Sequence, residues 1–289
     1  MQTETLRAAY AACERLARAH YENFPVASRL LPASMRPHLA ALYAFARTAD
    51  DFADEGRRSA DERLRLLDDW EDRLHACVEI GERDPADHIF LAVAETIRAR
   101  NLPVGLFEDL LSAFRQDITM HRYETWAGVL DYCRRSANPV GRLVLRIAGY
   151  DDPRLDESSD ALCTALQLTN FWQDFGRDWR DGRLYVPLED VDACHALVRD
   201  LSDQRMTEPW RCALRTVACR TRDLFRAGRA VCDGVTGRLR YELRVTWLGG
   251  VRILDRLERD DFDVFVSRPQ LRAGDAPALL WSALTWKTS

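Results

Sequence analysis

The chain has 289 residues and a formal charge of −5, from 41 Lys and Arg against 46 Asp and Glu. Apolar residues make up 47% and charged residues 30%, which is typical of a globular protein with a large core and excludes collagen, a disordered tail and a small disulfide scaffold. The negative balance argues against nucleic acid as a partner. Because the only lysine is Lys287, chemistry that depends on an internal lysine, such as a Schiff base or a phosphate-loop lysine, is also excluded.

The eight cysteines form no C-x-x-C pair. The chain does not open with a signal peptide, since residues 1–14 carry Glu4, Arg7 and Glu14 and no long apolar run. Scattered thiols without a secretory signal are typical of reduced, buried cysteines. The longest weakly polar stretch, Ala276 to Trp286, is too short to cross a bilayer. We therefore expect a cytoplasmic protein with reduced cysteines that is not integral to a membrane.

Hydrophobic residues recur with helical spacing along almost all of the chain. Clusters of turn residues interrupt them at 32–37, 56–59, 81–85, 101–103, 149–153, 182–187 and 234–237. About eight to ten helices of ordinary length fit between these breaks. The best candidate strand, Asp261 to Ser267, is short, and neither a linker nor a repeat divides the chain. The sequence predicts a single all-α domain over residues 1–289, with its helices packed around a central space.

The segment Arg36 to Glu55 begins apolar and ends in a cluster of acidic residues. On a helix, Tyr43, Arg47, Asp50 and Asp54 step by four, three and four and share one face. The two aspartates lie one turn apart, about 6 Å between Cβ atoms, and repel each other unless a cation sits between them. Carboxylates at the C-terminal end of a helix also oppose its dipole. A solvated helix end is the ordinary alternative. Because both the repulsion and the helix dipole disfavour these acids, however, we expect their charge to have a function.

A second polar stripe runs along the segment Ala161 to Asp181, which is otherwise apolar and aromatic. Its members step by three, four, four and three: Gln167, Asn170, Asp174, Asp178 and Asp181. The alternative is an ordinary amphipathic helix with its wet side outward. The stripe, however, holds only amides and acids, without the interleaved Arg or Lys of a salt-bridged surface. It also repeats the four-residue aspartate pair of the first segment.

Two such aspartate pairs facing each other across a bundle would form an oxygen-donor site for Mg²⁺, which keeps several waters and bridges to phosphate. The Glu-x-x-His pairs of di-iron bundles are absent. Arg47 shares the aspartate face, and further arginines lie near the stripes: Arg134, Arg135, Arg177, Arg180 and Arg183. This combination predicts ionisation of an allylic or similar diphosphate in an apolar cavity. Candidate wall residues are Phe24, Tyr43, Phe45, Phe171, Trp172 and Tyr185.

These motifs resemble the squalene/phytoene synthases, all-α enzymes of the isoprenoid-synthase fold, from about Phe24 to Phe265. NFPVASRLLP resembles the family's N-terminal substrate segment, LYAFARTADDFADE its first aspartate-rich motif, and ALQLTNFWQDFGRDWRDGRLYVP its second motif with the turn that follows. The resemblance implies a helical bundle around a central apolar cavity. It implies that Mg²⁺ and diphosphate are held by Asp50, Asp54, Asp174 and Asp178, with Asn170 as a further metal ligand. The implied substrate contacts are Tyr43, Arg47, Asp51, Gln167, Asn170, Gln173, Arg183 and Tyr185.

The chain departs from the common family pattern at three positions. Arg135 stands where the tyrosine implicated in eukaryotic squalene synthase chemistry falls, Arg177 replaces an acid, and Gln173 replaces an arginine. With ENFPVASRLLP, SANPVGRLVL and ELR…GG…RILDRLERDDFDVF, these departures resemble the hydroxysqualene synthase branch of the bacterial hopanoid pathway. That branch implies conversion of presqualene diphosphate to hydroxysqualene by ionisation, cation rearrangement and water capture, with Mg²⁺ and without NADPH.

Two other functions stay open. A head-to-head prenyl transferase would make presqualene diphosphate, squalene or phytoene from farnesyl or geranylgeranyl diphosphate. A non-catalytic assembly protein would have kept the fold but is expected to have lost an aspartate pair, and both pairs are present. The metal motif N-S/D-x-x-S-x-x-x-E of a class I terpene cyclase is not found. A greasy substrate and product are compatible with transient contact at the inner face of the membrane and with hand-over to other enzymes of squalene synthesis.

Overall fold

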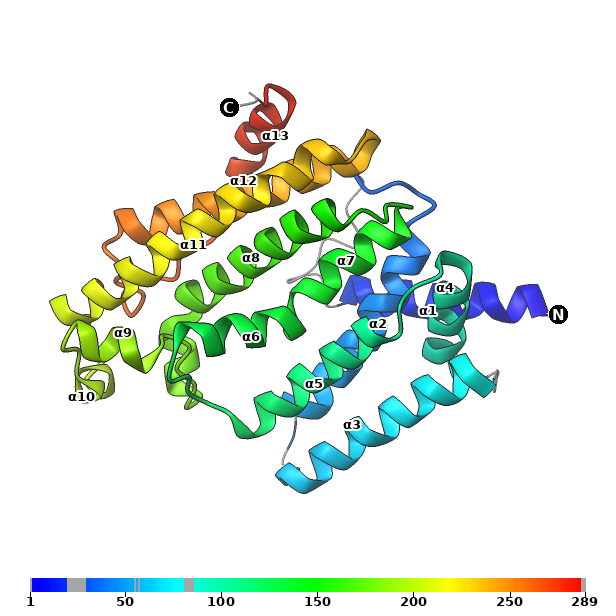
Figure 1. Ribbon diagram of the computed structural model, residues 1–289, viewed down its shortest axis with the longest axis horizontal. Helices are drawn as coiled ribbons and strands as arrows, with labels where there is room; N and C mark the ends of the chain where they lie inside the picture. The colour runs from blue at the N-terminus through cyan, green and yellow to red at the C-terminus, as the bar shows by residue number, and fades with distance from the viewer. Residues whose placement is uncertain (1, 20–29, 55, 57, 81–85, 287–289) are drawn as a thin grey trace. The chain divides into compact units, whose positions relative to one another are not determined.

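The computed structural model describes residues 2–19, 30–54, 56, 58–80 and 86–286, and this part of the chain is helical (Figure 1). The elements in chain order are α1 Gln2–Ala19, α2 Arg36–Asp54, α3 Ala60–His75, the π-helical turn η1 Ala76–Ile80, α4 His88–Arg100, α5 Gly105–Thr119, α6 Trp126–Ser136, α7 Asn138–Ile147, α8 Pro153–Arg180, α9 Leu188–Ala193, α10 Val198–Ser202, α11 Glu208–Gly234, α12 Gly237–Arg259, the 3₁₀ turn η2 Ala273–Asp275 and α13 Ala276–Leu284. The all-α prediction is confirmed.

The helices group into two compact units. The first unit spans Met1–Thr119 and Pro139–Asp152 and holds α1 to α5 and nearly all of α7. The second unit spans Met120–Asn138 and Pro153–Ser289 and holds α6 and α8 to α13. The expectation of a single domain over residues 1–289, with a cavity at its centre, stays a prediction.

Side-chain hydrogen bonds mark where the helices begin. Ser59 forms a capping box at the start of α3: its Oγ accepts from the Glu62 N–H at 3.3 Å, and its own N–H donates to Glu62 Oε2 at 2.8 Å. Thr125 caps α6 by accepting from the Gly128 N–H at 3.2 Å. The breaks expected at 32–37, 56–59, 149–153 and 234–237 all coincide with helix ends. The break expected at 81–85 lies outside the described residues.

The core of the first unit fixes the orientation of α2. Phe45 is fully buried, and its ring meets Phe107 of α5 edge-on at 5.4 Å between centroids. Trp70 of α3 lies 5.7 Å from the same ring. Five alanines of α2 are also buried, which lets the neighbouring helices approach closely. With one side of α2 held in the core, the side that carries Arg47 and Asp50 is left half-exposed.

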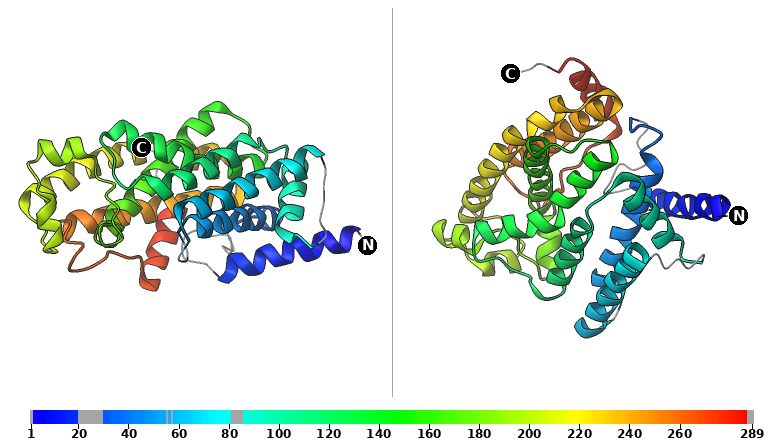
Figure 2. Two further views of the ribbon diagram at one scale, coloured as in Figure 1. Left: turned by 90° about the horizontal axis from the view of Figure 1, so that it is seen from below. Right: turned by 45° about the vertical axis from the view of Figure 1, so that its right-hand side comes forward.

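The second unit is built on α8, α11 and α12, which run side by side (Figures 1 and 2). Gly228 lets α11 touch the backbone of α8, because a Cβ at this position would come within 2.5 Å of the Leu162 nitrogen. Gly250 lets α12 pack closely on the side chains of α8 and α11, since a Cβ there would lie 2.6 Å from Leu166 and 2.7 Å from Phe225. The second glycine of the Gly-Gly pair in the sequence therefore serves close helix packing.

Asp261 to Ser267, the best candidate strand of the sequence, is not a strand. The segment forms turns after α12, and Asp261 and Phe262 have φ of 50° and 56°, which a strand cannot adopt. The Phe262 N–H donates to the Leu257 carbonyl at 2.8 Å and thereby ends the helix. Phe262 and Val264 are buried, so the apolar alternation reflects a packed reversal of the chain.

No helix among the described residues is long and apolar enough to span a bilayer.

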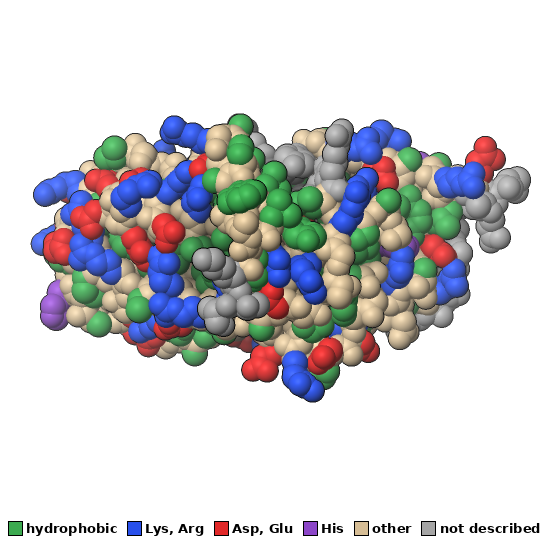
Figure 3. Space-filling view, turned by 90° about the horizontal axis from the view of Figure 1, so that it is seen from above, with side chains coloured by type: hydrophobic (Ala, Val, Ile, Leu, Met, Phe, Trp, Pro, Cys, Tyr) green, Lys and Arg blue, Asp and Glu red, His purple; other side chains and the backbone are tan. Residues whose placement is uncertain are grey.

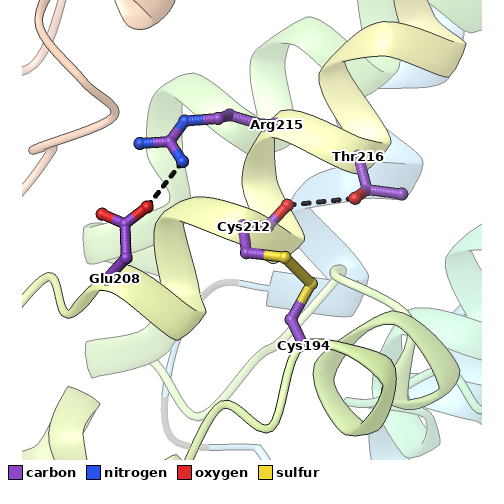
Figure 4. The surroundings of a disulfide bond; sticks show 5 residues. All are labelled: Cys194, Glu208, Cys212, Arg215 and Thr216. Carbon is purple, nitrogen blue, oxygen red and sulfur yellow. Dashed lines mark hydrogen bonds and ion pairs between the residues drawn. A yellow bond between two sulfur atoms is a disulfide. The ribbon is translucent and has the colours of Figure 1, made fainter.

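The sequence led us to expect reduced and buried cysteines, and this expectation is wrong for some of them. Cys194, just after α9, forms a disulfide with Cys212 on α11 (Figure 4). Among the others, Cys219 is exposed and Cys163 is half-buried, whereas Cys13, Cys77, Cys133 and Cys232 are buried as predicted. Burial raises the pKa of Cys13 and of Cys232 to about 12, which keeps both thiols protonated. Sequence spacing alone could not pair two cysteines that tertiary packing brings together.

The disulfide predicts a redox-dependent stability. It links positions 18 residues apart, and closing such a loop in the unfolded chain stabilises the fold by about 3 kcal/mol. We expect Cys194→Ser/Cys212→Ser, or dithiothreitol added to the wild type, to lower the free energy of unfolding measured with urea. Cys219→Ser is the matched control and should change nothing. An equal response to dithiothreitol in wild type and double variant would contradict the prediction.

Candidate active site

The first acidic stripe lies at the C-terminal end of α2, and an arginine joins its acids. Arg47 Nη1 lies 3.3 Å from Asp50 Oδ2, and Arg47 Nη2 pairs with Asp51. All three side chains are half-buried, and Asp54, the last residue of the helix, is exposed. Tyr43 begins the stripe, and burial raises the pKa of its hydroxyl, so that it stays a hydrogen-bond donor. The structure thus places the predicted residues of this stripe along one side of the helix end.

Arg63, which the sequence analysis missed, closes the end of α2. Its guanidinium donates to the Ala53 carbonyl and, at 3.2 Å, to the Gly56 carbonyl. This positive charge at the helix C-terminus offsets the unfavourable meeting of acidic side chains with the negative end of the dipole. Arg63 comes from α3, and no local pattern around the aspartates indicated it.

The second acidic stripe lies on the C-terminal half of α8. Asn170 donates its amide to Asp174 Oδ2 at 2.7 Å, four residues along the helix. Arg268, from the segment between α12 and α13, forks the same carboxylate: Nε donates to Oδ1, and Nη2 donates to Oδ2 at 2.9 Å. Arg177 lies 3.8 Å from Asp174 Oδ1. Asp174 therefore contacts one amide and two guanidinium groups, which are charge-assisted partners of its carboxylate.

Asp178, one turn further along α8, lies in an environment that disfavours its charge. Burial and the neighbouring Asp174 carboxylate raise the pKa of Asp178 to about 7, and Asp181 adds to the effect. Arg183 and Arg177 act in the opposite direction without compensating. A divalent cation bound to Asp174 and Asp178 would stabilise both ionised carboxylates, because it would offset their mutual repulsion and the cost of burying their charge.

Gln173 connects α8 to the segment that carries Arg268. Its side-chain amide donates to the Pro269 carbonyl, one residue after Arg268. Gly176 lets Phe265 of the same segment approach α8, since a Cβ there would lie 3.3 Å from the ring. The predicted substrate contact of Gln173 stays a prediction. Gln173 stands where the family commonly has an arginine, and in this structure it holds the segment that places Arg268 beside Asp174.

The turn after α8 places Arg183 and Tyr185. Gly182 has φ of 84°, and the Arg183 N–H donates to the Asp178 carbonyl at 2.7 Å, which reverses the chain beside the stripe. The Leu184 N–H then donates to the His121 carbonyl at 2.8 Å. Tyr185 is buried, and its ring stacks on Phe171 of α8 at 3.7 Å between centroids with 3° between planes. The turn thus ties a cationic side chain and an aromatic stack to the helix that carries the acids.

The other predicted positions are distributed as follows. Gln167 is half-buried on α8, one turn before Asn170. Phe45 and Trp172 are fully buried in the cores of their units, and Trp172 Nε1 donates to Thr221 Oγ1 at 2.9 Å. Phe24, Glu55 and most of NFPVASRLLP lie outside the described residues. Arg134 and Arg135 both pair with Asp131 of α6, each at 3.0 Å.

The donor types of each stripe fit Mg²⁺. Within the part of the chain that the structure describes, no group of three or more His, Cys, Asp or Glu side chains could hold a metal by itself. Each stripe offers a carboxylate pair, and the second adds the Asn170 amide oxygen. These are hard oxygen donors at low number, which suits Mg²⁺ that takes its remaining ligands from water and a diphosphate.

Comparison with known proteins agrees with the sequence resemblance. A family model described as squalene/phytoene synthase matches residues 17–275. A hydroxysqualene synthase of Rhodopseudomonas palustris is 40% identical over 243 residues, which cover 83% of this chain and 80% of that protein. A hydroxysqualene synthase of Zymomonas mobilis is 39% identical over 208 residues, 71% of this chain and 68% of that protein.

Solved structures agree on the fold. A squalene synthase of Alicyclobacillus acidocaldarius superposes with a TM-score of 0.83 at 40% identity, covering 89% of this chain and 95% of that one. A dehydrosqualene synthase in complex with a ligand gives a TM-score of 0.85 at 21% identity over 99% of both chains. The predicted all-α isoprenoid-synthase bundle is confirmed, and so is the resemblance to hydroxysqualene synthases.

Asp178 predicts a pH dependence of stability in the absence of metal. Its pKa is about 7 in the folded chain and about 4 in an unfolded one. Between these values the unfolded chain releases the proton first, so the free energy of unfolding falls as pH rises from 4 to 7. Asp178→Asn removes this titration. With EDTA present, we expect the stability of the variant relative to wild type to increase from pH 5 to pH 8 in urea unfolding. Asp192→Asn, at an exposed position of α9, is the control, and an unchanged slope in Asp178→Asn would contradict the assignment.

Proposed function

We propose that this chain, which belongs to the squalene/phytoene synthase family, is a hydroxysqualene synthase that converts presqualene diphosphate to hydroxysqualene. One observation carries the proposal: both acidic stripes occupy the ends of long helices with guanidinium groups in contact, in a chain about 40% identical to hydroxysqualene synthases over most of its length. A chain that had kept only the fold would not be expected to keep both.

The two stripes would act on the same diphosphate. Asp50, Asp54, Asp174 and Asp178, with Asn170, would hold Mg²⁺, which when bound supplies charge that stabilises the departing diphosphate. Arg47 now contacts two carboxylates of α2. On binding, its planar guanidinium can turn to the phosphate oxygens, which it fits in a bidentate manner. Asp51 then serves to hold Arg47 in place, and Arg183 adds a second cation beside α8.

The reaction needs a leaving group, a protected cation and water. The carbon–oxygen bond to the diphosphate breaks, and the diphosphate leaves with both electrons. The cyclopropylcarbinyl cation rearranges, and water adds through its oxygen and loses a proton to give the alcohol. The nucleophile is water, so we propose that no NADPH is used. Phe171 and Tyr185, stacked and buried beside the second stripe, support surroundings in which bulk water is kept from the cation.

The prenyl diphosphate substrate follows from the family, and further partners are part of the proposal. The proposed substrate and product each carry a hydrocarbon skeleton of thirty carbons, which partitions into lipid. We therefore propose a cytoplasmic enzyme that contacts the inner face of the membrane transiently and exchanges its substrate or product with other enzymes of squalene synthesis. Nucleic acid is not proposed as a partner because the formal charge is −5.

Head-to-head condensation is the second candidate function. The specific observation that favours it is the solved relative with 40% identity, which is described as a squalene synthase. Such an enzyme would start from a C15 diphosphate, and a reduced product would require NADPH. The starting material that the purified enzyme consumes therefore separates the two candidates.

Product analysis tests the proposed function directly. Purified enzyme supplied with presqualene diphosphate and Mg²⁺ is expected to release diphosphate and hydroxysqualene, identified by mass spectrometry, at the same rate with and without NADPH. In H₂¹⁸O the alcohol should gain the heavy isotope, because water supplies its oxygen. Efficient formation of presqualene diphosphate from farnesyl diphosphate, or formation of squalene that depends on NADPH, would overturn the proposal.

A further inference from the structure

Helix α13 presents large apolar side chains to solvent. Leu280, Trp281 and Leu284 are 43%, 68% and 63% exposed. Their spacing places them on one face of the helix. On the opposite side Leu279 and Ala283 are buried. A surface helix normally turns a polar face outward, so an apolar outer face needs its own explanation.

The helix is fixed in place on the second unit. At its C-terminal end Arg244 Nη1 donates to the Ala283 carbonyl at 3.3 Å. At its N-terminal end Asp275 accepts from Arg252 at 3.2 Å and from Arg256 at 2.6 Å. α13 packs on α12, and both views show it on the outer side of that helix (Figures 1 and 2). The exposed face is therefore held by ion pairs and is not a frayed end.

Basic groups flank an uncharged segment. No charged residue occurs from Ala276 to Trp286, and Asp275, directly before it, is paired with two arginines. The exposed Arg272 precedes this acid, and Lys287 follows the segment. The indole of Trp286 lies 4.0 Å from the guanidinium of Arg229 and 5.1 Å from that of Arg244. Figure 3, which looks from the side where Figure 1 shows α13, has apolar side chains next to basic ones. Tryptophan between an apolar face and cations is the pattern of the membrane–water interface.

We infer that α13 is a docking helix that lies in the headgroup region of a bilayer rich in anionic phospholipid. Trp281 and Leu284 would enter the acyl boundary, and Arg272 and Arg229 would face the phosphates. A second copy of the chain fits less well. Three side chains expose a few hundred Å² at most, whereas a stable interface buries about 800 Å² on each partner.

Docking through α13 deepens the proposed function and rests on it in one respect only: a substrate that partitions into lipid gives membrane contact a purpose. The docking itself depends on the exposed face and the flanking cations. Vesicle binding without substrate can therefore fail or succeed independently of turnover.

Vesicle sedimentation tests the inference with the full chain. The wild type should sediment with vesicles of phosphatidylglycerol and phosphatidylcholine, and much less with phosphatidylcholine alone or at high salt. Trp281→Ser/Leu284→Ser should weaken binding to the anionic vesicles about tenfold or more. The matched control is Met120→Ser/Leu197→Ser, which changes apolar side chains that are 44% and 46% exposed elsewhere in the same unit, and it should bind like wild type.

Further outcomes decide against the inference. Equal vesicle binding by Trp281→Ser/Leu284→Ser and wild type would overturn it, and so would failure of the wild type to bind anionic vesicles. A dimer in sedimentation velocity that the α13 variant loses would assign the face to a second copy. The circular dichroism of the α13 variant and its turnover of detergent-dispersed substrate should match wild type. Loss of vesicle binding could then not be attributed to loss of folding.

Discussion

Carboxylates placed one turn apart on a helix repel, and two helices of this protein carry such a pair. On α2 the cost is reduced by Arg47, which contacts Asp50 and Asp51. On α8 it is reduced by Arg268, which forks Asp174, while Asp178 keeps a raised pKa. Divalent cations with a diphosphate would satisfy these acids more fully than the arginines do, and the arginines would then be available to the phosphates. The same charges thus hold the resting state together and favour the ligand.

Periodicity alone predicted the parts of the site that lie along one helix. The first stripe was expected on a helix over residues 36–55, and α2 runs from Arg36 to Asp54. The second was expected over residues 161–181, and α8 covers it to Arg180 but begins earlier, at Pro153. Residues three and four apart on a helix share a face whatever surrounds them. Both predictions therefore needed no knowledge of the tertiary structure.

The features that the sequence could not predict depend on contacts between distant residues. Arg268 lies 94 residues from Asp174, and nothing near either residue indicates the pairing. Arg63 reaches the end of α2 from another helix. The disulfide joins Cys194 to Cys212 across a reversal of the chain. Alternating buried residues such as Phe262 and Val264 occur both in strands and in packed turns, so the sequence pattern alone could not separate the two. The positive φ of Phe262 shows that the segment is a turn.

In the proposed function the two acidic stripes bind one diphosphate, and energetic coupling between the stripes tests this directly. Isothermal titration calorimetry would measure the affinity for inorganic diphosphate with Mg²⁺ in wild type, Asp50→Asn, Asp174→Asn and the double variant. If both stripes bind the same diphosphate, each single variant should lose about 100-fold in affinity and the double variant little more. Losses that simply add, or wild-type affinity in either single variant, would contradict it.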